Sequence, residues 1–289
     1  MKNKIVYIGV HAVVFLSICL SSAHAVTLRT NQSKVRVIAL PGEAQAGSIE
    51  VENPSEATLI VKVFTEDWKY TAVHDGSKDF LPAGTTGNSC AEWISFFPPE
   101  FILTPFSKQK VNYTVKTPKD LLTGHYAVLF FQTSIGKPDL KEGVGMNVNI
   151  RIGTLFYVEP KGLTRRQAEC NDFSVRTKPE DSSLQITFDL KNTGNIDIMS
   201  FANFNLIDKK GIVYARGLFN DTYTFPDESA SLNASWKEPI PAGRYDLVIT
   251  LDLGKALEDA GLGRGPVLVK EASVEIDARG YVVKVSPLQ

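Results

Sequence analysis

The sequence predicts an all-β fold, with two immunoglobulin-like β-sandwich domains in tandem. Short segments in which apolar and polar residues alternate recur along the chain, clusters of turn-forming residues separate them, and hardly any stretch has helical periodicity. The length of 289 residues suits two domains of ordinary size.

Residues 1–25 have the pattern of a secretory signal peptide. Lys2 and Lys4 precede the apolar stretch Ile5–Leu20, and Ala23-x-Ala25 is a typical cleavage site. Removing the two lysines from a formal charge of −1 leaves −3, which is too close to neutral to favour nucleic acid as a partner. No later stretch approaches the ~20 apolar residues of a membrane span. We therefore expect an exported protein that neither spans the membrane nor binds nucleic acid.

Residues 26–160 form the first predicted domain. Tyr126–Phe131 is apolar on both faces, so we expect a covered strand in the middle of a sheet. The roughly twenty residues after Tyr70 are rich in Gly, Ser, Thr and Asp, which favours a loop or a poorly ordered excursion. The other expected strands are Lys34–Leu40, Ser48–Glu52, Thr58–Tyr70, Trp93–Phe97 and the segment around Val111–Val115.

The segment Gly143–Pro160 is the most informative part of this domain. Four apolar residues, Met146, Val148, Ile150 and Ile152, occupy every second position and alternate with Asn147, Asn149 and Arg151. This is the period of a strand with one apolar face. A long strand of this kind at a sheet edge invites pairing with another chain, and proteins usually prevent such pairing unless it serves their function.

Residues 161–289 form the second predicted domain. Gly124-x-Tyr126 and Gly243-x-Tyr245 each open an apolar strand, as in the tyrosine corner of immunoglobulin-like sandwiches, where the phenol bonds back to the preceding turn. Asp252–Gly263 is the one expected short helix. The expected strands are Leu184–Leu190, Phe204–Ile207, Ile212–Tyr214, Tyr245–Leu251 and Val267–Ile276, with a hairpin turn at Asp208–Gly211.

No motif points to catalysis, a cofactor or a metal. His74 and His125 are the histidines after the signal, and neither has the spacing of a metal site. Glu66 and Asp67 are adjacent on a predicted strand, so they point to opposite faces and cannot act on one bond. We read them as a solvated strand end and expect no enzyme.

The two cysteines that follow the signal, Cys90 and Cys170, lie in different predicted domains. Either one disulfide or two free thiols fits the sequence, because spacing alone does not fix a pairing.

Two arginines are candidates for binding a carboxylate. Arg36 lies in the first β-rich segment and Arg151 in the long strand. If these strands are neighbours, the two guanidinium groups can converge and hold a carboxylate with bidentate hydrogen bonds. On the residues alone, two unrelated surface arginines are the simpler interpretation.

Several motifs, in order over about 125 residues, resemble the N-terminal domain of periplasmic pilus-assembly chaperones. They are Lys34-Val35-Arg36-Val37-Ile38 before Pro41-Gly42, Ile49-x-Val51-x-Asn53, Leu103-x-Pro105, Pro118 to Gly124-x-Tyr126, and Leu155-Phe156-Tyr157 before Pro160. The second domain shares the immunoglobulin-like character without a distinctive motif.

The resemblance implies a periplasmic chaperone that captures pilus, fimbrial or related surface-fibre subunits by donating the strand at residues 144–158. Met146, Val148, Ile150 and Ile152 match the donor positions, and Arg36 matches the first of two basic residues that anchor a subunit's carboxylate. Counting back from Leu155, the second basic position falls on Ile152, one residue after Arg151. Either a bulge, which Gly153 would permit, brings Arg151 to the right face, or Arg151 has another role. An outer-membrane assembly usher and a homodimer that covers the long strand are further expectations.

One alternative belongs to another class of function. A structural or adhesive cell-envelope protein can use the same two domains to bind a polymer or surface without catalysis. An exposed aromatic patch that includes Trp68, Trp93 or Trp236 would favour it, whereas an exposed face from Met146 to Ile152 favours the chaperone.

Overall fold

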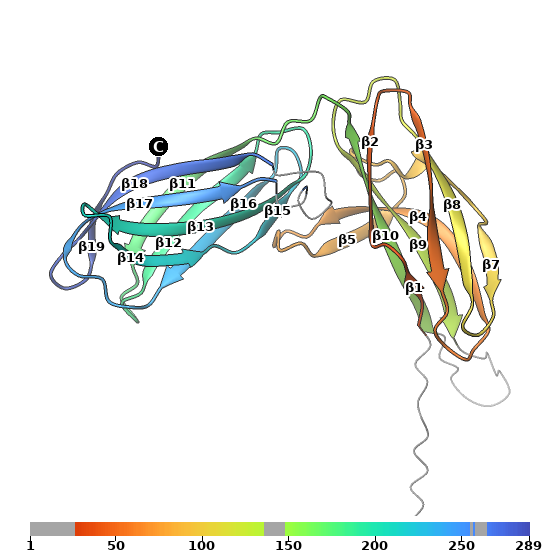
Figure 1. Cartoon of the computed structure of the whole chain (residues 1–289), viewed down its shortest axis with the longest axis horizontal. Coiled ribbons are helices and arrows are strands. Elements are labelled where there is room, and N and C mark those ends of the chain that lie inside the picture. The colour runs from red at the N-terminus through yellow and green to blue at the C-terminus, as the bar shows by residue number, and fades with distance from the viewer. Residues whose placement is uncertain (1–26, 136–147, 255–256, 258–264) are drawn as a thin grey trace, which may run out of the picture.

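The all-β fold predicted from the sequence is confirmed. The structure, a computed structural model, describes residues 27–135, 148–254, 257 and 265–289. Their strands form four sheets, arranged as two β-sandwich domains that meet at an angle (Figure 1). The predicted signal peptide, Met146 and most of the predicted helix Asp252–Gly263 lie outside the described residues.

The first sandwich packs a four-stranded sheet, in the order β1-β3-β8-β6, against a larger sheet, in the order β2-β10-β9-β4-β5 with β7 also paired to β4. Its elements are β1 (Arg29–Thr30), β2 (Lys34–Ala39), β3 (Ala44–Glu52), β4 (Leu59–Tyr70), β5 (Lys78–Pro82), the 3₁₀ turn η1 (Ala91–Trp93), β6 (Ile94–Phe97), β7 (Glu100–Leu103), β8 (Lys108–Lys116), β9 (His125–Ile135) and β10 (Val148–Pro160).

Alternation along each strand fills the space between these two sheets. Val35 and Val37 of β2 point inward together with Phe131 of β9 and Phe156 of β10, and all four are buried in one apolar cluster. Burying a side chain of this size contributes about 1.5–3 kcal/mol relative to leaving it in water. Strand β9 lies between β10 and β4, in the central position predicted from its apolar faces.

The segment after Tyr70 differs from its prediction. In place of a loop, residues 71–77 form a turn and Lys78–Pro82 returns as β5, paired antiparallel with the end of β4. Asp67 of β4 is also buried, where a solvated strand end was expected. Its carboxylate accepts hydrogen bonds from Thr86 N, at 2.7 Å, and from the Ser89 hydroxyl, at 2.5 Å. The segment after Tyr70 therefore forms a β4–β5 hairpin, and Thr86 and Ser89 beyond it bond to Asp67 of β4.

The second sandwich packs the sheet β11-β12-β16 against the sheet β14-β13-β17-β18-β19, with β15 also paired to β13. Buried and half-buried side chains alternate along Leu184–Leu190, as predicted. The predicted turn Asp208–Gly211 connects β13 to β14, with Gly211 N donating to Asp208 O. Its strands are β11 (Ala168–Thr177), β12 (Leu184–Asn192), β13 (Ile198–Asp208), β14 (Val213–Leu218), β15 (Thr222–Thr224), β16 (Ser229–Trp236), β17 (Gly243–Asp252), β18 (Val267–Ile276) and β19 (Val282–Val285).

The two predicted tyrosine corners have different outcomes. Tyr245 donates from its hydroxyl to Pro241 O at 2.7 Å, which confirms a corner within the second domain. The Tyr126 hydroxyl instead accepts a hydrogen bond from Asp197 N of the second domain, also at 2.7 Å. A Cβ on Gly124 would overlap this hydroxyl, so glycine is needed for the close approach.

Aromatic side chains continue the contact between the domains. Phe225, from the loop after β15, stacks on Tyr126 with ring centroids 4.2 Å apart and lies 5.2 Å from Trp68. Burial holds the pKa of the Tyr126 phenol well above its ordinary value, so the hydroxyl stays protonated and neutral. The domains therefore meet through an apolar surface with specific hydrogen bonds.

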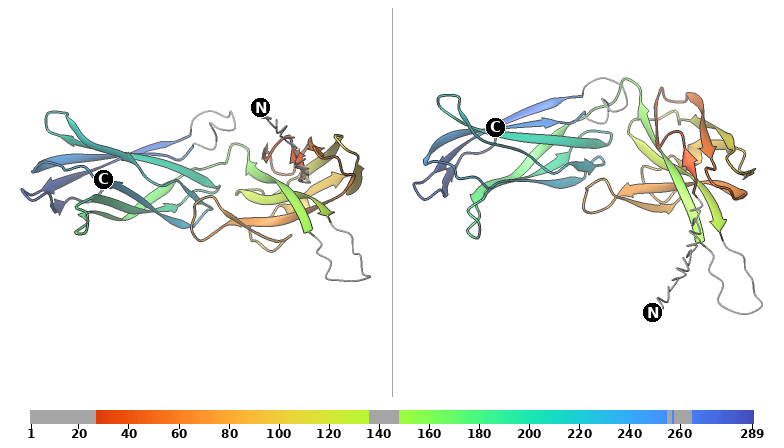
Figure 2. Two further views of the ribbon diagram at one scale, coloured as in Figure 1. Left: turned by 90° about the horizontal axis from the view of Figure 1, so that it is seen from below. Right: turned by 60° about the horizontal axis from the view of Figure 1, so that its bottom comes forward.

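The β4–β5 hairpin also contacts the second domain. Figure 2 shows the β4–β5 turn lying against the end of that domain. Two polar contacts join His74 to Tyr223: Tyr223 N donates to His74 O at 2.9 Å, and His74 Nδ1 lies 2.9 Å from Tyr223 O. Gly76 packs under the Tyr223 ring, where a Cβ would lie 2.8 Å from the nearest ring carbon.

Replacing Tyr126 with phenylalanine tests the junction. Tyr126→Phe leaves the buried Asp197 N–H without an acceptor, and we expect a loss of about 1–3 kcal/mol in the free energy of unfolding, measured with denaturant. Tyr245→Phe is the matched control, since its acceptor Pro241 lies near solvent in a turn. A smaller loss in Tyr126→Phe than in the control would contradict the assignment.

Candidate functional site

Strand β10 is paired on one side over only part of its length. Its antiparallel ladder with β9 runs without interruption from Val148, opposite Ile135, to Val158, opposite His125. Its parallel ladder with β2 begins only at Leu155. Among the described residues, no strand pairs with the other edge of β10 from Val148 to Gly153. As far as the described residues show, the backbone there has room for one more strand.

The predicted donor side chains lie along this open edge. Val148 is 45% exposed, Ile150 is half-buried opposite Thr133, and Ile152 packs against the core of the first sandwich. The three side chains point to the same face as the buried Phe156. The apolar row therefore runs from the core at Phe156 to solvent at Val148. A strand placed beside β10 would bring its own side chains against this row.

The ladder contains no bulge at Gly153. Gly153 stands opposite Phe130 in unbroken register, so the bulge that Arg151 would need to act as the second anchor is absent. Its missing side chain instead leaves room for the Phe130 ring, because a Cβ there would lie 2.9 Å from a ring carbon. Arg151 consequently points to the face opposite Ile150 and Ile152.

Arg151 has partners of its own on that face. Its Nη1 donates to Glu66 Oε1 at 3.0 Å, and its guanidinium lies 4.6 Å from the centre of the Phe130 ring. The side chain is 42% exposed. This is a surface ion pair stacked on an aromatic ring.

Arg36 lies on the same face of the sheet, but far from Arg151. It stands opposite Tyr157 in the β2–β10 ladder and lies 4.7 Å above that ring. Six positions along a strand separate Tyr157 from Arg151, or roughly 20 Å. The strands are neighbours as predicted, yet the register keeps the two guanidinium groups apart. The expectation that they converge on one carboxylate is therefore corrected, because convergence needs adjacent register positions.

Arg36 instead belongs to a buried ionic cluster at the junction of the domains. It pairs with Glu159 of β10 and lies 3.6 Å from Asp197 Oδ1 in the second domain. Arg166, in the linking segment, donates to Glu159 at 3.1 Å. Glu159 is fully buried and Asp197 almost so. Two cations and two anions thus balance each other across the junction, which sequence reasoning missed.

A signal for this cluster was present in the sequence. Glu159 ends a strongly apolar strand directly before Pro160, and a carboxylate in that position needs a cationic partner if it is buried. Nothing local marked Arg166 or Asp197 as that partner, because they approach only once the domains pack together.

The three tryptophans and two cysteines that the sequence singled out lie apart from one another. Trp68 is buried and donates to Ala127 O at 3.0 Å, Trp93 lies against His125 with centroids 4.4 Å apart, and Trp236 is in the second domain. They form no common exposed patch, so that observation does not favour the adhesive alternative. Cys90 and Cys170 are both free thiols.

No cluster of three or more histidine, cysteine, aspartate or glutamate side chains in the described part of the chain is arranged to hold a metal ion. No helix in those residues is long and apolar enough to cross a membrane.

Comparison with known proteins finds likenesses in structure. No family model matches the sequence, and no curated protein matches it. The class 5 fimbriae chaperone CfaA is similar over 84% of this chain and 97% of its own, with a TM-score of 0.49 and 10% identity. The E. coli chaperone DraB is similar over 84% and 97%, with a TM-score of 0.41 and 15% identity.

A third solved structure is the Salmonella enterica complex of the SafA pilin with the SafB chaperone, similar over 86% of this chain and 97% of the matched chain, with a TM-score of 0.45 and 12% identity. Each of these three solved structures contains a chaperone.

The two arginines should differ sharply in their effect on stability. Arg36→Met leaves Glu159 and Asp197 buried with one cation fewer, and we expect it to cost about 3–5 kcal/mol in the free energy of unfolding. Arg151→Met is the matched control, and its exposed pair should cost no more than about 1 kcal/mol. Equal losses in denaturant titrations would show that Arg36 is not a partner in the cluster.

Proposed function

We propose that this protein is a periplasmic chaperone for pilus, fimbrial or related surface-fibre subunits, without catalytic activity. It binds a client by placing the free edge of β10 beside an incomplete sheet of the client. The client gains backbone hydrogen bonds and apolar side chains from the donated strand. Val148, Ile150 and Ile152 are the donor residues within the described chain, and Met146 extends the same alternating row in the sequence.

The observation that carries this proposal is that no described strand pairs with the second edge of β10 from Val148 to Gly153. Natural proteins guard edges with proline, charged side chains, bulges or covering segments. Residues 148–153 contain no proline and one charged residue, Arg151, which is paired with Glu66, and the ladder with β9 has no bulge. Val148 is exposed and Ile150 is half-buried on the opposite face. An edge of this kind is costly to leave open, which supports a role in binding another chain.

The buried ionic cluster holds β10 in a fixed position relative to the second domain. Arg36, Glu159 and Asp197 join β2 and β10 to the second domain where the two strands pair fully. The free half of β10 extends from this anchored half. We assign Arg36 this structural role, because its guanidinium is already paired with Glu159 and Asp197. That Arg36 also binds the carboxylate of a client stays a prediction.

Other partners follow from the resemblance. A free copy of the chaperone would cover its apolar row by pairing β10 with a second copy, and an assembly usher would receive the client. The class of client follows from the proposed strand donation, because a protein whose sheet lacks one strand has a place for the donated strand.

The direct test is capture of clients from the native cell envelope. Val148→Asp plus Ile150→Asp places two charges on the donor row while the buried part of β10 stays unchanged. We expect small strand-deficient fibre subunits to co-purify with the wild type and to fall at least tenfold in the double variant, measured by quantitative mass spectrometry.

The matched control is Val269→Asp plus Val283→Asp, two exposed valines of the second domain. It should retain the wild-type partners, and both double variants should keep the wild-type melting temperature within a few degrees. Unchanged capture by the folded Val148→Asp plus Ile150→Asp variant would contradict strand donation.

A further inference from the structure

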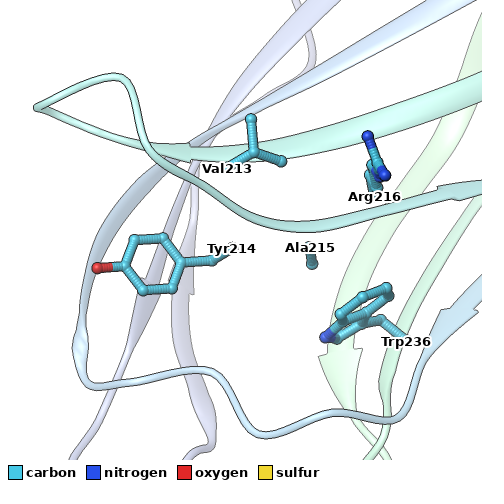
Figure 3. Close-up of a pocket in the computed structure, with 5 residues that line it drawn as sticks. All are labelled: Val213, Tyr214, Ala215, Arg216 and Trp236. Atoms are coloured by element: carbon cyan, nitrogen blue, oxygen red, sulfur yellow. The ribbon is translucent and has the colours of Figure 1, made fainter.

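Two arginines on end or half-paired strands differ in how their side chains are held. Arg216 of β14 is exposed beside a pocket of about 270 Å³ in the second domain (Figure 3). None of the other residues that line this pocket is acidic, and they are Val213, Tyr214, Ala215 and Trp236. Arg151 of β10 differs, because its side chain contacts three other strands of its sheet.

The Arg151 side chain crosses the face of the larger sheet that is opposite the donor row. Its guanidinium lies 4.6 Å from the centre of the Phe130 ring on β9, and Nη1 donates to Glu66 Oε1 on β4 at 3.0 Å. The Phe80 ring of β5 lies 5.9 Å from the same guanidinium and 4.9 Å from the Phe130 ring. These four side chains, which we call the Arg151 brace, join β10 to the three strands that follow it in the sheet.

The Arg151 brace lies where β10 has a single partner strand. Arg151 stands between Val148 and Gly153, the part of β10 that pairs only with β9 among the described strands. A strand end paired along one edge opens more readily than a central strand. When this end of β10 leaves β9, Arg151 loses its contacts with Glu66 and both rings. The brace therefore opposes opening while the donor row on the other face stays uncovered.

The Arg151 brace also connects β10 to the domain junction. Phe80 belongs to the β4–β5 hairpin, and the turn of this hairpin contacts the second domain through His74 and Tyr223. One hairpin therefore contacts both the second domain and the half of β10 that lies beyond the β2 ladder. The brace gives this hairpin a role at the donor strand as well as at the junction.

We propose that Arg151 is a positioning residue for client binding, which holds the donor half of β10 in the plane of the sheet through the Arg151 brace. The purpose of the brace rests on the proposed function, because a strand that is already ordered loses less conformational entropy when a client pairs with it. Arg151 acts from the face opposite the donor row, so it positions the strand without contacting the groove of the client.

The test compares amide exchange in the full exported chain without a client. The Ile150 amide faces β9, because N–H groups alternate along a strand and that of Leu155 faces β2. Arg151→Glu brings two carboxylates together and should speed exchange of the Ile150 amide about tenfold, whereas the Val158 amide, at the far end of the same ladder, should not change. Arg216→Glu is the matched control and should change neither amide.

Exchanging the two charges separates the brace from a general effect of charge. Glu66→Arg alone should also speed the Ile150 amide. The double variant Arg151→Glu plus Glu66→Arg should return it to nearly the wild-type rate, because the ion pair forms again with its partners exchanged. An unchanged Ile150 amide in Arg151→Glu, or a double variant as fast as the single ones, overturns the proposal.

Capture of fibre subunits from the cell envelope separates the brace from strand donation itself. We expect Arg151→Glu to capture severalfold less than the wild type or Arg216→Glu, and the double variant with Glu66→Arg to recover. Wild-type capture by Arg151→Glu overturns the positioning role, and so does a double variant that captures no better, because Arg151 would then contact the client directly. Absence of capture by the wild type contradicts strand donation, and the exchange rates still decide the brace.

Discussion

The rest of the structure depends on the register of β10 between its two neighbours. One side of the strand is fully paired to β9, whereas the other meets β2 only from Leu155 onward. The paired half carries Phe156 and Val158 into the core and Glu159 into the domain junction. From Val148 to Gly153 the strand keeps the same apolar alternation, and no strand of the described chain pairs with its second edge. One strand thus joins the fold of the first domain to a surface suited to binding.

The junction explains why the free half of β10 has a defined position. Buried charges are tolerated only when they are paired, and the cluster around Glu159 uses cations from β2 and from the linking segment and a second anion from the other domain. Tyr126, Phe225 and the β4–β5 turn add hydrogen bonds and stacked rings around it. Two sandwiches that share such contacts have little freedom to turn about one another, because each turn would leave a buried polar group unpaired.

Sequence reasoning found those features that depend on local pattern. Alternation identified most strands, the two-sided apolar run placed β9 in the middle of a sheet, and the Gly243-x-Tyr245 motif predicted a tyrosine corner. It failed where a residue's partner lies far away in the chain. The Tyr126 hydroxyl bonds to the second domain, Asp67 is buried by a returning hairpin, and the β2–β10 register separates Arg36 from Arg151. Each of these depends on how distant segments pack, which no local spacing encodes.

The central claim is that β10 has a free edge that a client strand occupies, and amide hydrogen exchange tests it residue by residue. Leu155 N donates toward β2, to Ser33 O, so the amides of Arg151 and Gly153 point to the same side, where β2 does not reach. In the free monomer these two amides should exchange at least a hundredfold faster than those of Ile152 and Leu155, and they should become protected when a fibre subunit is bound. Protection of Arg151 and Gly153 in the free monomer, or their continued fast exchange in the client complex, would contradict strand donation from this edge.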